Sequence, residues 1–340
     1  MDLATLTADL AQGRTSALAR AISMVENGRP GFEQLLAAVH SRLGRAHRVG
    51  ITGPPGAGKS TLAQQLVQAW RQQGLTVAVI AVDPTSPFSG GALLGDRIRM
   101  ESVALDRGVY IRSMATRGSL GGLATTTREV CDVLDAGGFD RVLIETVGVG
   151  QSELAVTGMA DSTVLVLVPE SGDAIQTMKS GVMEAADLYV VNKADRAGAG
   201  KLARELEVTL GIRHGNAFRG IRAHHGTALP AEAGSAAPGW EPPVLETVAT
   251  RNQGIGELTE ALERHYHWMT ESGELAARRT RRVEARTREV VDRALHRWTW
   301  RETRAEEVLR DRLPDLAAGR VSPYELAAEI VSGVKEGVRA

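Results

Sequence analysis

Residues 53–60 read Gly-Pro-Pro-Gly-Ala-Gly-Lys-Ser, which matches the phosphate-binding pattern G-x-x-x-x-G-K-[ST]. An apolar segment precedes the motif at 49–52 and an amphipathic segment follows it at 61–71, so a strand, a loop and a helix are expected in that order. The loop's N–H groups could surround a phosphate, while Lys59 adds a cation and Ser60 a hydroxyl for Mg²⁺. The predicted phosphate-binding residues are Gly53, Pro54, Pro55, Gly56, Ala57, Gly58, Lys59, Ser60 and Thr61.

Apolar segments of strand length alternate with helical segments between residues 47 and 265. These segments span residues 47–52, 76–82, 109–113, 139–145, 162–168, 187–191 and 244–249. The alternation predicts the α/β class, with a doubly wound, mostly parallel sheet that helices cover on both faces. Helical periodicity before and after this region predicts an N-terminal extension over 1–46 and a C-terminal arm over 266–340.

The segment Asn192-Lys193-Ala194-Asp195 follows an apolar strand and indicates which base is bound. Asp195 could accept hydrogen bonds from N1–H and from the C2 amine of guanine, whereas adenine offers neither donor. A carboxylate facing adenine would lose about 1–3 kcal/mol or more. Asn192 could bond the base from the other side, and the stem of Lys193 could cover the ring. GTP or GDP is therefore the predicted ligand.

Carboxylates also stand at the ends of two strands near the predicted phosphate loop. Glu145 ends a run of four β-type residues, and Gly148 could offer its N–H to a γ-phosphate. Asp83 opens a loop rich in proline, glycine and hydroxyl side chains that also contains Asp96, and this composition is typical of a switch. Two alternatives stay open, namely that Glu145 caps a helix and that this loop is an ordinary surface loop. The predicted catalytic residues are Lys59, Asp83, Glu145 and Gly148.

Composition narrows the class of protein. The 340 residues carry a net charge of −1, and arginines alternate with glutamates over 278–312, which is typical of a solvated or interface helix rather than a nucleic-acid arm. One cysteine, Cys131, excludes a disulfide framework. The first twenty residues lack a signal-peptide core, and no run of 18 apolar residues exists. We expect a cytoplasmic protein that binds neither nucleic acid nor membranes.

Together, these motifs resemble the G-protein chaperones of methylmalonyl-CoA mutase, the MeaB/ArgK-type P-loop GTPases of the signal-recognition-like class. The resemblance rests on residues 53–60, 82–87, 90–100, 145–153 and 192–195, and it covers about the whole chain. It implies a Mg²⁺-dependent GTPase that gates cofactor loading or protection in an adenosylcobalamin-dependent acyl-CoA mutase. Methylmalonyl-CoA mutase is the expected client, although isobutyryl-CoA and related mutases use similar helpers.

The resemblance also implies roles by position. The residues expected around the metal ion and the γ-phosphate are Ser60, Asp83, Asp96 and Glu145. The residues of a third switch that signals to the mutase are Asp173, Gln176 and Lys179. Val248-Ala249 stands where the loop that contacts guanine O6 usually reads Ser-Ala, and since a backbone N–H makes that contact, the change should be tolerated.

Three other functions stay open at this point. A nickel-inserting GTPase metallochaperone needs clustered cysteine and histidine ligands, whereas His224-His225 is the one adjacent histidine pair in the sequence. An ATPase or kinase associated with amino-acid transport would not need Asp195, and the sequence lacks a protein-kinase catalytic loop. The third alternative is a scaffold that binds nucleotide without hydrolysing it, and a measurement of steady-state turnover would separate this scaffold from an enzyme.

The segment 273–314 is too long and too charged for a core helix of the nucleotide domain. It nevertheless carries apolar residues that should not all face water, namely Val283, Val290, Leu295, Trp298, Trp300 and Val308. An apolar stripe with Arg and Glu on its flanks suits pairing with a second copy across a two-fold axis. We therefore predict a homodimer, with folding of this arm onto its own nucleotide domain as the alternative.

Overall fold

The computed structural model describes residues 2–83, 100–115, 120–146, 155–171, 182–213 and 239–339. Within these ranges, seven strands form one sheet in the order β3-β2-β4-β1-β5-β6-β7, and each neighbouring pair is parallel. The strands are β1 (His47–Thr52), β2 (Val77–Asp83), β3 (Val109–Ala115), β4 (Arg141–Thr146), β5 (Ser162–Leu167), β6 (Leu188–Asn192) and β7 (Val244–Thr247). The predicted fold class is confirmed.

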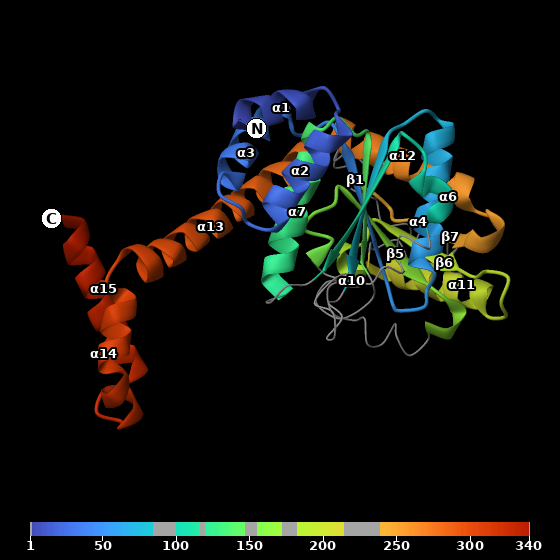
Figure 1. Ribbon diagram of the computed structural model, residues 1–340. Helices are drawn as coiled ribbons and strands as arrows, with labels where there is room; N and C mark the ends of the chain where they lie inside the picture. Colours follow the sequence, from blue (N-terminus) through green and yellow to red (C-terminus); the bar gives the residue numbers. More distant parts are fainter. Residues whose placement is uncertain are drawn as a thin grey trace. The chain divides into compact units, whose positions relative to one another are not determined.

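Helices cover both faces of this sheet (Figure 1). One face packs against α1 (Leu3–Ala11), α2 (Thr15–Glu26), α3 (Phe32–Val39) and α7 (Leu120–Ala136). The other face packs against α4 (Lys59–Gln72), α6 (Glu101–Ala104) and α12 (Ile255–Ser272). Helices α10 (Val182–Ala185) and α11 (Ala199–Arg213) form a third cluster with β5 and β6. The 3₁₀ turns are η1 (His40–Arg42), η2 (Pro169–Ser171) and η3 (Ala249–Arg251).

The sheet is buried on both faces, which explains why its strands read as continuous apolar runs. In β1, Val49 and Ile51 pack into the cluster around α4. Gly50, between them, faces the opposite side, where a Cβ would lie only 2.8 Å from the side chain of Val156. Because every pair is parallel, the carboxyl ends of all seven strands meet at one edge, where ligands bind in folds of this kind.

The N-terminal helices belong to the main core. Leu10, Ile22 and Leu35 share one buried cluster with the sheet residues Ile80 and Ile144. This face of the sheet is therefore closed by the chain's first three helices together with α7.

A buried ion network holds the connection between these helices and β1. The guanidinium of Arg48 lies 2.8 Å from Asp132 and 3.0 Å from Asp135. The carboxylate of Asp135 also accepts the backbone N–H groups of Gly44, Arg45 and Ala46. Breaking a buried network of this kind costs about 3–5 kcal/mol, since it leaves a charge uncompensated.

The chain divides into two compact units, Met1–Ala276 and Ala277–Ala340. The second unit comprises most of α13 (Glu274–Glu302) together with α14 (Ala305–Ala317) and α15 (Pro323–Arg339). It has a small core of its own around Leu326 and Ile330, and Trp300 and Val308 pack against this core. No helix in the described ranges is both long and apolar enough to cross a membrane.

The apolar spacing from Val283 to Val308 predicts one long helix, but the structure has two helices there. α13 ends at Glu302 and α14 begins at Ala305. The hydroxyl of Thr303 donates to the carbonyl of Thr299 and accepts the N–H of Ala305, so a local side-chain bond ends one helix and starts the next. Two members of the expected stripe, Trp300 and Val308, accordingly pack inside the second unit.

Candidate nucleotide-binding site

The loop between β1 and α4 has a backbone that only glycine permits at two positions. Gly53 has φ +138°, and a Cβ there would lie 2.1 Å from the carbonyl oxygen of Val166. Gly58 has φ +88°, and a Cβ there would lie 2.4 Å from Nδ2 of Asn192. Helix α4 begins at Lys59, immediately after the loop, so the positive end of its dipole faces any phosphate held by the loop.

Lys59 is held inside this loop. Its side chain is buried, and Nζ donates to the carbonyl oxygens of Gly53 at 2.7 Å and Pro54 at 3.0 Å. These contacts fix the ammonium group against the loop before any phosphate engages it. A phosphate in the loop would meet a cation that is already positioned.

The hydroxyl of Ser60 lies 2.5 Å from Oε1 of Glu145. This contact follows from the sheet, because β4 pairs with β1 and places Glu145 opposite Ile51. Glu145 is 1% exposed and lies within β4, so it does not cap a helix. A hydroxyl and a carboxylate oxygen are hard ligands of the type that Mg²⁺ prefers, so this pair fits the predicted metal site.

Asn192 connects three loops of the site. It is buried, and its Nδ2 donates to the carbonyl oxygen of Ala57 at 2.8 Å. Its Oδ1 accepts the hydroxyl of Thr247 at 3.1 Å and the N–H of Ala249 at 3.2 Å. Both polar atoms of the amide thus contact protein in this structure, and a direct bond from Asn192 to the base stays a prediction.

Thr247 is a site residue that the sequence reasoning missed. It ends β7 and lies directly opposite Asn192 in the parallel β6–β7 pair. The sequence did offer a signal for Thr247. It is a polar residue at the end of an apolar strand, as Asn192 is in the predicted base-reading motif. Val248 and Ala249, which follow it, are buried as the loop turns toward Asn192.

The rest of the base-reading motif lies beside the phosphate loop. Lys193 has a left-handed backbone with φ +58°, and its Nζ donates to the carbonyl oxygen of Gly56 at 2.7 Å. The carboxylate of Asp195 is about one-third exposed and forms an ion pair with Arg251. The predicted base-reading and phosphate-binding residues therefore meet at one edge of the sheet.

Several predicted residues are only partly covered by the structure. The backbone of Asp83 ends β2 next to Ala115, but its side chain is outside the described part. The predicted residues outside the described ranges are Asp96, Gly148, Asp173, Gln176 and Lys179. Among the described residues, no cluster of three or more histidine, cysteine, aspartate or glutamate side chains could hold a metal ion.

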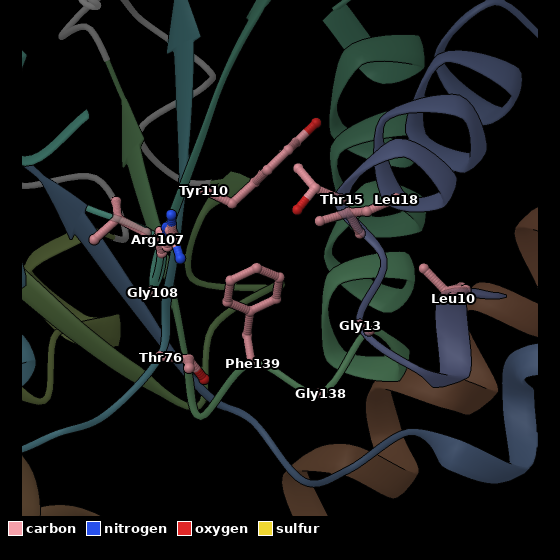
Figure 2. Close-up of a pocket in the computed structure, with 12 residues that line it drawn as sticks. Leu10, Gly13, Thr15, Leu18, Thr76, Arg107, Gly108, Tyr110, Gly138 and Phe139 are labelled. Carbon is pink, nitrogen blue, oxygen red and sulfur yellow. The ribbon is translucent and has the colours of Figure 1, made fainter. Parts of the chain in front are cut away.

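A separate cavity of about 270 Å³ lies at the opposite edge of the sheet, near the amino ends of β2, β3 and β4. Figure 2 shows the rings of Tyr110 and Phe139 between the sheet edge and Leu18 of α2. The ring centroids of Tyr110 and Phe139 are 6.3 Å apart. The cavity thus lies between the N-terminal helices and the sheet, and none of the predicted nucleotide-site residues lines it.

A glycine-rich phosphate loop after β1, followed after β6 by the Asn-Lys-x-Asp motif, defines the class of P-loop GTPases. The family model described as "Methylmalonyl Co-A mutase-associated GTPase MeaB" matches residues 18–304. The chain belongs to this family, and it is a GTPase that binds GTP and GDP.

Known proteins agree with this assignment. A protein of Pyrococcus abyssi that is named as a GTPase is 47% identical over 280 residues, covering 82% of this chain and 81% of its own length. The GTPase ArgK of Escherichia coli K12 is 37% identical over 270 residues, covering 78% and 76%. The crystal structure of a LAO/AO transport system kinase superposes with a TM-score of 0.65 at 27% identity, covering 98% of this chain and 97% of that one.

Proposed function

We propose that this GTPase is a chaperone that gates cofactor loading or protection in an adenosylcobalamin-dependent acyl-CoA mutase, with methylmalonyl-CoA mutase as the client. The observation that carries the proposal is the match to the mutase-associated family across residues 18–304. The convergence of the phosphate loop and the base-reading motif on Asn192 supports a working nucleotide switch.

Mg²⁺ is the proposed cofactor, and Ser60 and Glu145 are its proposed protein contacts. The hydrogen bond between them supports this assignment, because it shows that both oxygens reach the same point beside the phosphate loop, where a Mg²⁺ ion could take the place of the shared proton. The ion would neutralise charge on the β- and γ-phosphates during hydrolysis. Asp83 and Asp96 complete the proposed metal surroundings, and Gly148 supplies the proposed N–H to the γ-phosphate.

Hydrolysis by the isolated protein is expected to be slow. Val149 follows Gly148 at the position where Ras-like proteins place a water-orienting glutamine. A bound mutase would accelerate hydrolysis by ordering the switches, and Asp173, Gln176 and Lys179 are the proposed transmitters. Substituting Gln176 and Lys179 should leave GTP affinity nearly unchanged but abolish stimulation by the mutase.

The protein is further proposed to act as a homodimer through α13. Its side chains Val283, Val290, Val291 and Leu295 are each at least 40% exposed. They recur at helical spacing along one charged helix, which supports a paired interface rather than four unrelated surface residues.

The client is tested by mixing the purified protein with purified methylmalonyl-CoA mutase and measuring phosphate release. Stimulated release together with a stable complex on size-exclusion chromatography is the expected result. If the mutase neither binds nor alters turnover, while an isobutyryl-CoA mutase does both, the client is wrong but the chaperone class stands. If neither mutase has any effect, the chaperone proposal fails.

A further inference from the structure

Arg251 is placed beside the carboxylate that is expected to read guanine. Its guanidinium lies 3.4 Å from Oδ2 of Asp195. Among the described residues, Arg251 is the cationic side chain paired with this carboxylate. No motif assigns a role to this arginine, which follows the Val248-Ala249 loop by two residues.

The loop that carries Arg251 is fixed by its own backbone. The N–H of Arg251 donates to the carbonyl of Val248 at 2.9 Å, and Val248 exchanges two further backbone bonds with Gln253. Asn252 has a left-handed backbone at φ +56°, which closes the turn. Since Ala249 of the same loop donates to Asn192, the position of Arg251 is tied to the base-reading motif.

We propose that Arg251 is a specificity-determining residue, because it competes with the base for the Asp195 carboxylate. This inference rests on the proposed role of Asp195 in reading guanine. Guanine brings two donors, N1–H and the C2 amine, one for each carboxylate oxygen, and the guanidinium at Oδ2 hinders the approach of a donor to that oxygen. Arg251 therefore lowers the affinity for guanine nucleotides.

Competition from Arg251 should affect other bases less than guanine, because they offer fewer donors to the Asp195 carboxylate. Hypoxanthine has N1–H but no C2 amine, so it occupies one oxygen and leaves the other to Arg251. Adenine supplies neither donor, and Arg251 then keeps the carboxylate paired. The ion pair thus penalises guanine and spares its competitors, so Arg251 reduces discrimination between bases.

The test compares the full-length protein with its Arg251→Ala variant, using GDP and inosine diphosphate in isothermal titration calorimetry. Exposed ion pairs contribute up to about 1 kcal/mol, so GDP should bind about two- to fivefold more tightly to the variant at low salt. Binding of inosine diphosphate should change less, so the dissociation constant for inosine diphosphate divided by that for GDP should rise, by at most this two- to fivefold factor. The difference between the proteins should shrink as salt is added.

Two controls isolate the ion pair. Arg251→Lys keeps a cation and should stay close to the wild-type ratio. Arg264→Ala removes an arginine of similar exposure from α12, where it pairs with Glu260 rather than with the site, and should leave both affinities unchanged. The nucleotide ratio also cancels any general attraction between Arg251 and the phosphates, because both ligands carry the same diphosphate.

Opposite outcomes overturn the inference. If Arg251→Ala weakens both nucleotides equally, Arg251 contacts the ligand instead of competing with it. In an Asp195→Asn background, Arg251→Ala should no longer alter the ratio, and a ratio that still rises would also contradict the proposed competition. Asp195→Asn alone should shift preference from guanosine to xanthosine diphosphate. Absence of that shift would count against Asp195 as the guanine reader, which is a failure of the proposed function rather than of the ion pair.

Discussion

At the scale of single residues, Lys59 is the residue whose substitution we expect to lower the rate of GTP hydrolysis the most. Its ammonium group is already held by two carbonyl oxygens of the phosphate loop. Lys59→Ala should lower the rate of GTP hydrolysis by about 100-fold or more, because a preorganised charge at the transferring phosphate is lost. Phosphate release at saturating GTP measures this. Lys201→Ala, which removes an exposed lysine from α11, is the matched control and should have no effect.

We expect Asn192 to stabilise the fold even when no nucleotide is bound. Asn192→Ala removes three contacts and leaves the donors and acceptor of Ala57, Thr247 and Ala249 without this partner. The free energy of unfolding should fall by about 1–3 kcal/mol, and GDP affinity should fall with it. Urea titration of the nucleotide-free protein measures the first effect. A variant as stable as wild type would show that these bonds do not support the site.

The residues of the site differed in how far the sequence could reveal them. The place of Lys59 and Ser60 at the start of α4, directly after the phosphate loop, could be predicted because the motif fixes both residue type and position. Thr247 was not, since its partner Asn192 is 55 residues away and the pairing depends on strand order. Arg251 was also missed, because its contact with Asp195 is made by a turn whose shape depends on Asn252.

At the scale of elements, Asp140 joins the turn before β4 to the start of β2. Burial raises the pKa of its carboxyl, but bonds from the N–H and hydroxyl of Thr76 and the nearby charge of Arg45 outweigh burial and lower the pKa. A lowered folded pKa stabilises the protein above the unfolded value of about 3.9, and this contribution is lost as pH falls through the folded value.

Asp140→Asn should therefore be less stable than wild type at pH 7. The gap in unfolding free energy should narrow as the pH falls below about 4. Urea unfolding at a series of pH values measures it. Asp311→Asn on α14 is a control, because no ion pair or hydrogen bond is seen for this residue in the described structure. If the difference in unfolding free energy between the two proteins does not change with pH, the charge of the Asp140 carboxylate does not contribute to stability.

The elements themselves were largely predictable, with one instructive exception. The seven strands begin within two residues of the predicted positions because each is a buried apolar run between polar turns. The break between α13 and α14 was missed, since Thr303-Arg304 contains neither glycine nor proline and the apolar spacing continues across it. At this break the hydroxyl of Thr303, which bonds to the backbone of Thr299 and Ala305, takes the place of the glycine or proline that usually ends a helix.

At the scale of the molecule, the N-terminal helices should be indispensable to the first unit. Deleting residues 2–43 would uncover buried leucine-sized side chains worth about 1.5–3 kcal/mol each. The truncated protein should aggregate or melt far below wild type. Leu35→Ala in the full chain is the milder test and should cost about 2–5 kcal/mol while GDP still binds. An unchanged melting temperature after deletion would mean that these helices are an independent appendage.

The proposed dimer is tested on the full chain. Val290→Asp combined with Leu295→Asp places two charges on the exposed face of α13, and light scattering should then report a monomer that binds GDP normally. Val208→Asp, on an exposed valine of α11, controls for the added charge. A double variant that stays dimeric would move the interface to another surface.

The carboxylate of Asp135 has a consequence for the order in which the chain can fold during synthesis. It receives the N–H of Arg45, which lies 90 residues earlier in the chain. At about 5–20 residues per second, the ribosome needs roughly 5–20 seconds to make the intervening segment. During that interval the first three helices have been made but have neither α7 nor β4 to pack against. Their apolar faces therefore stay without their native partners until those later elements have been made.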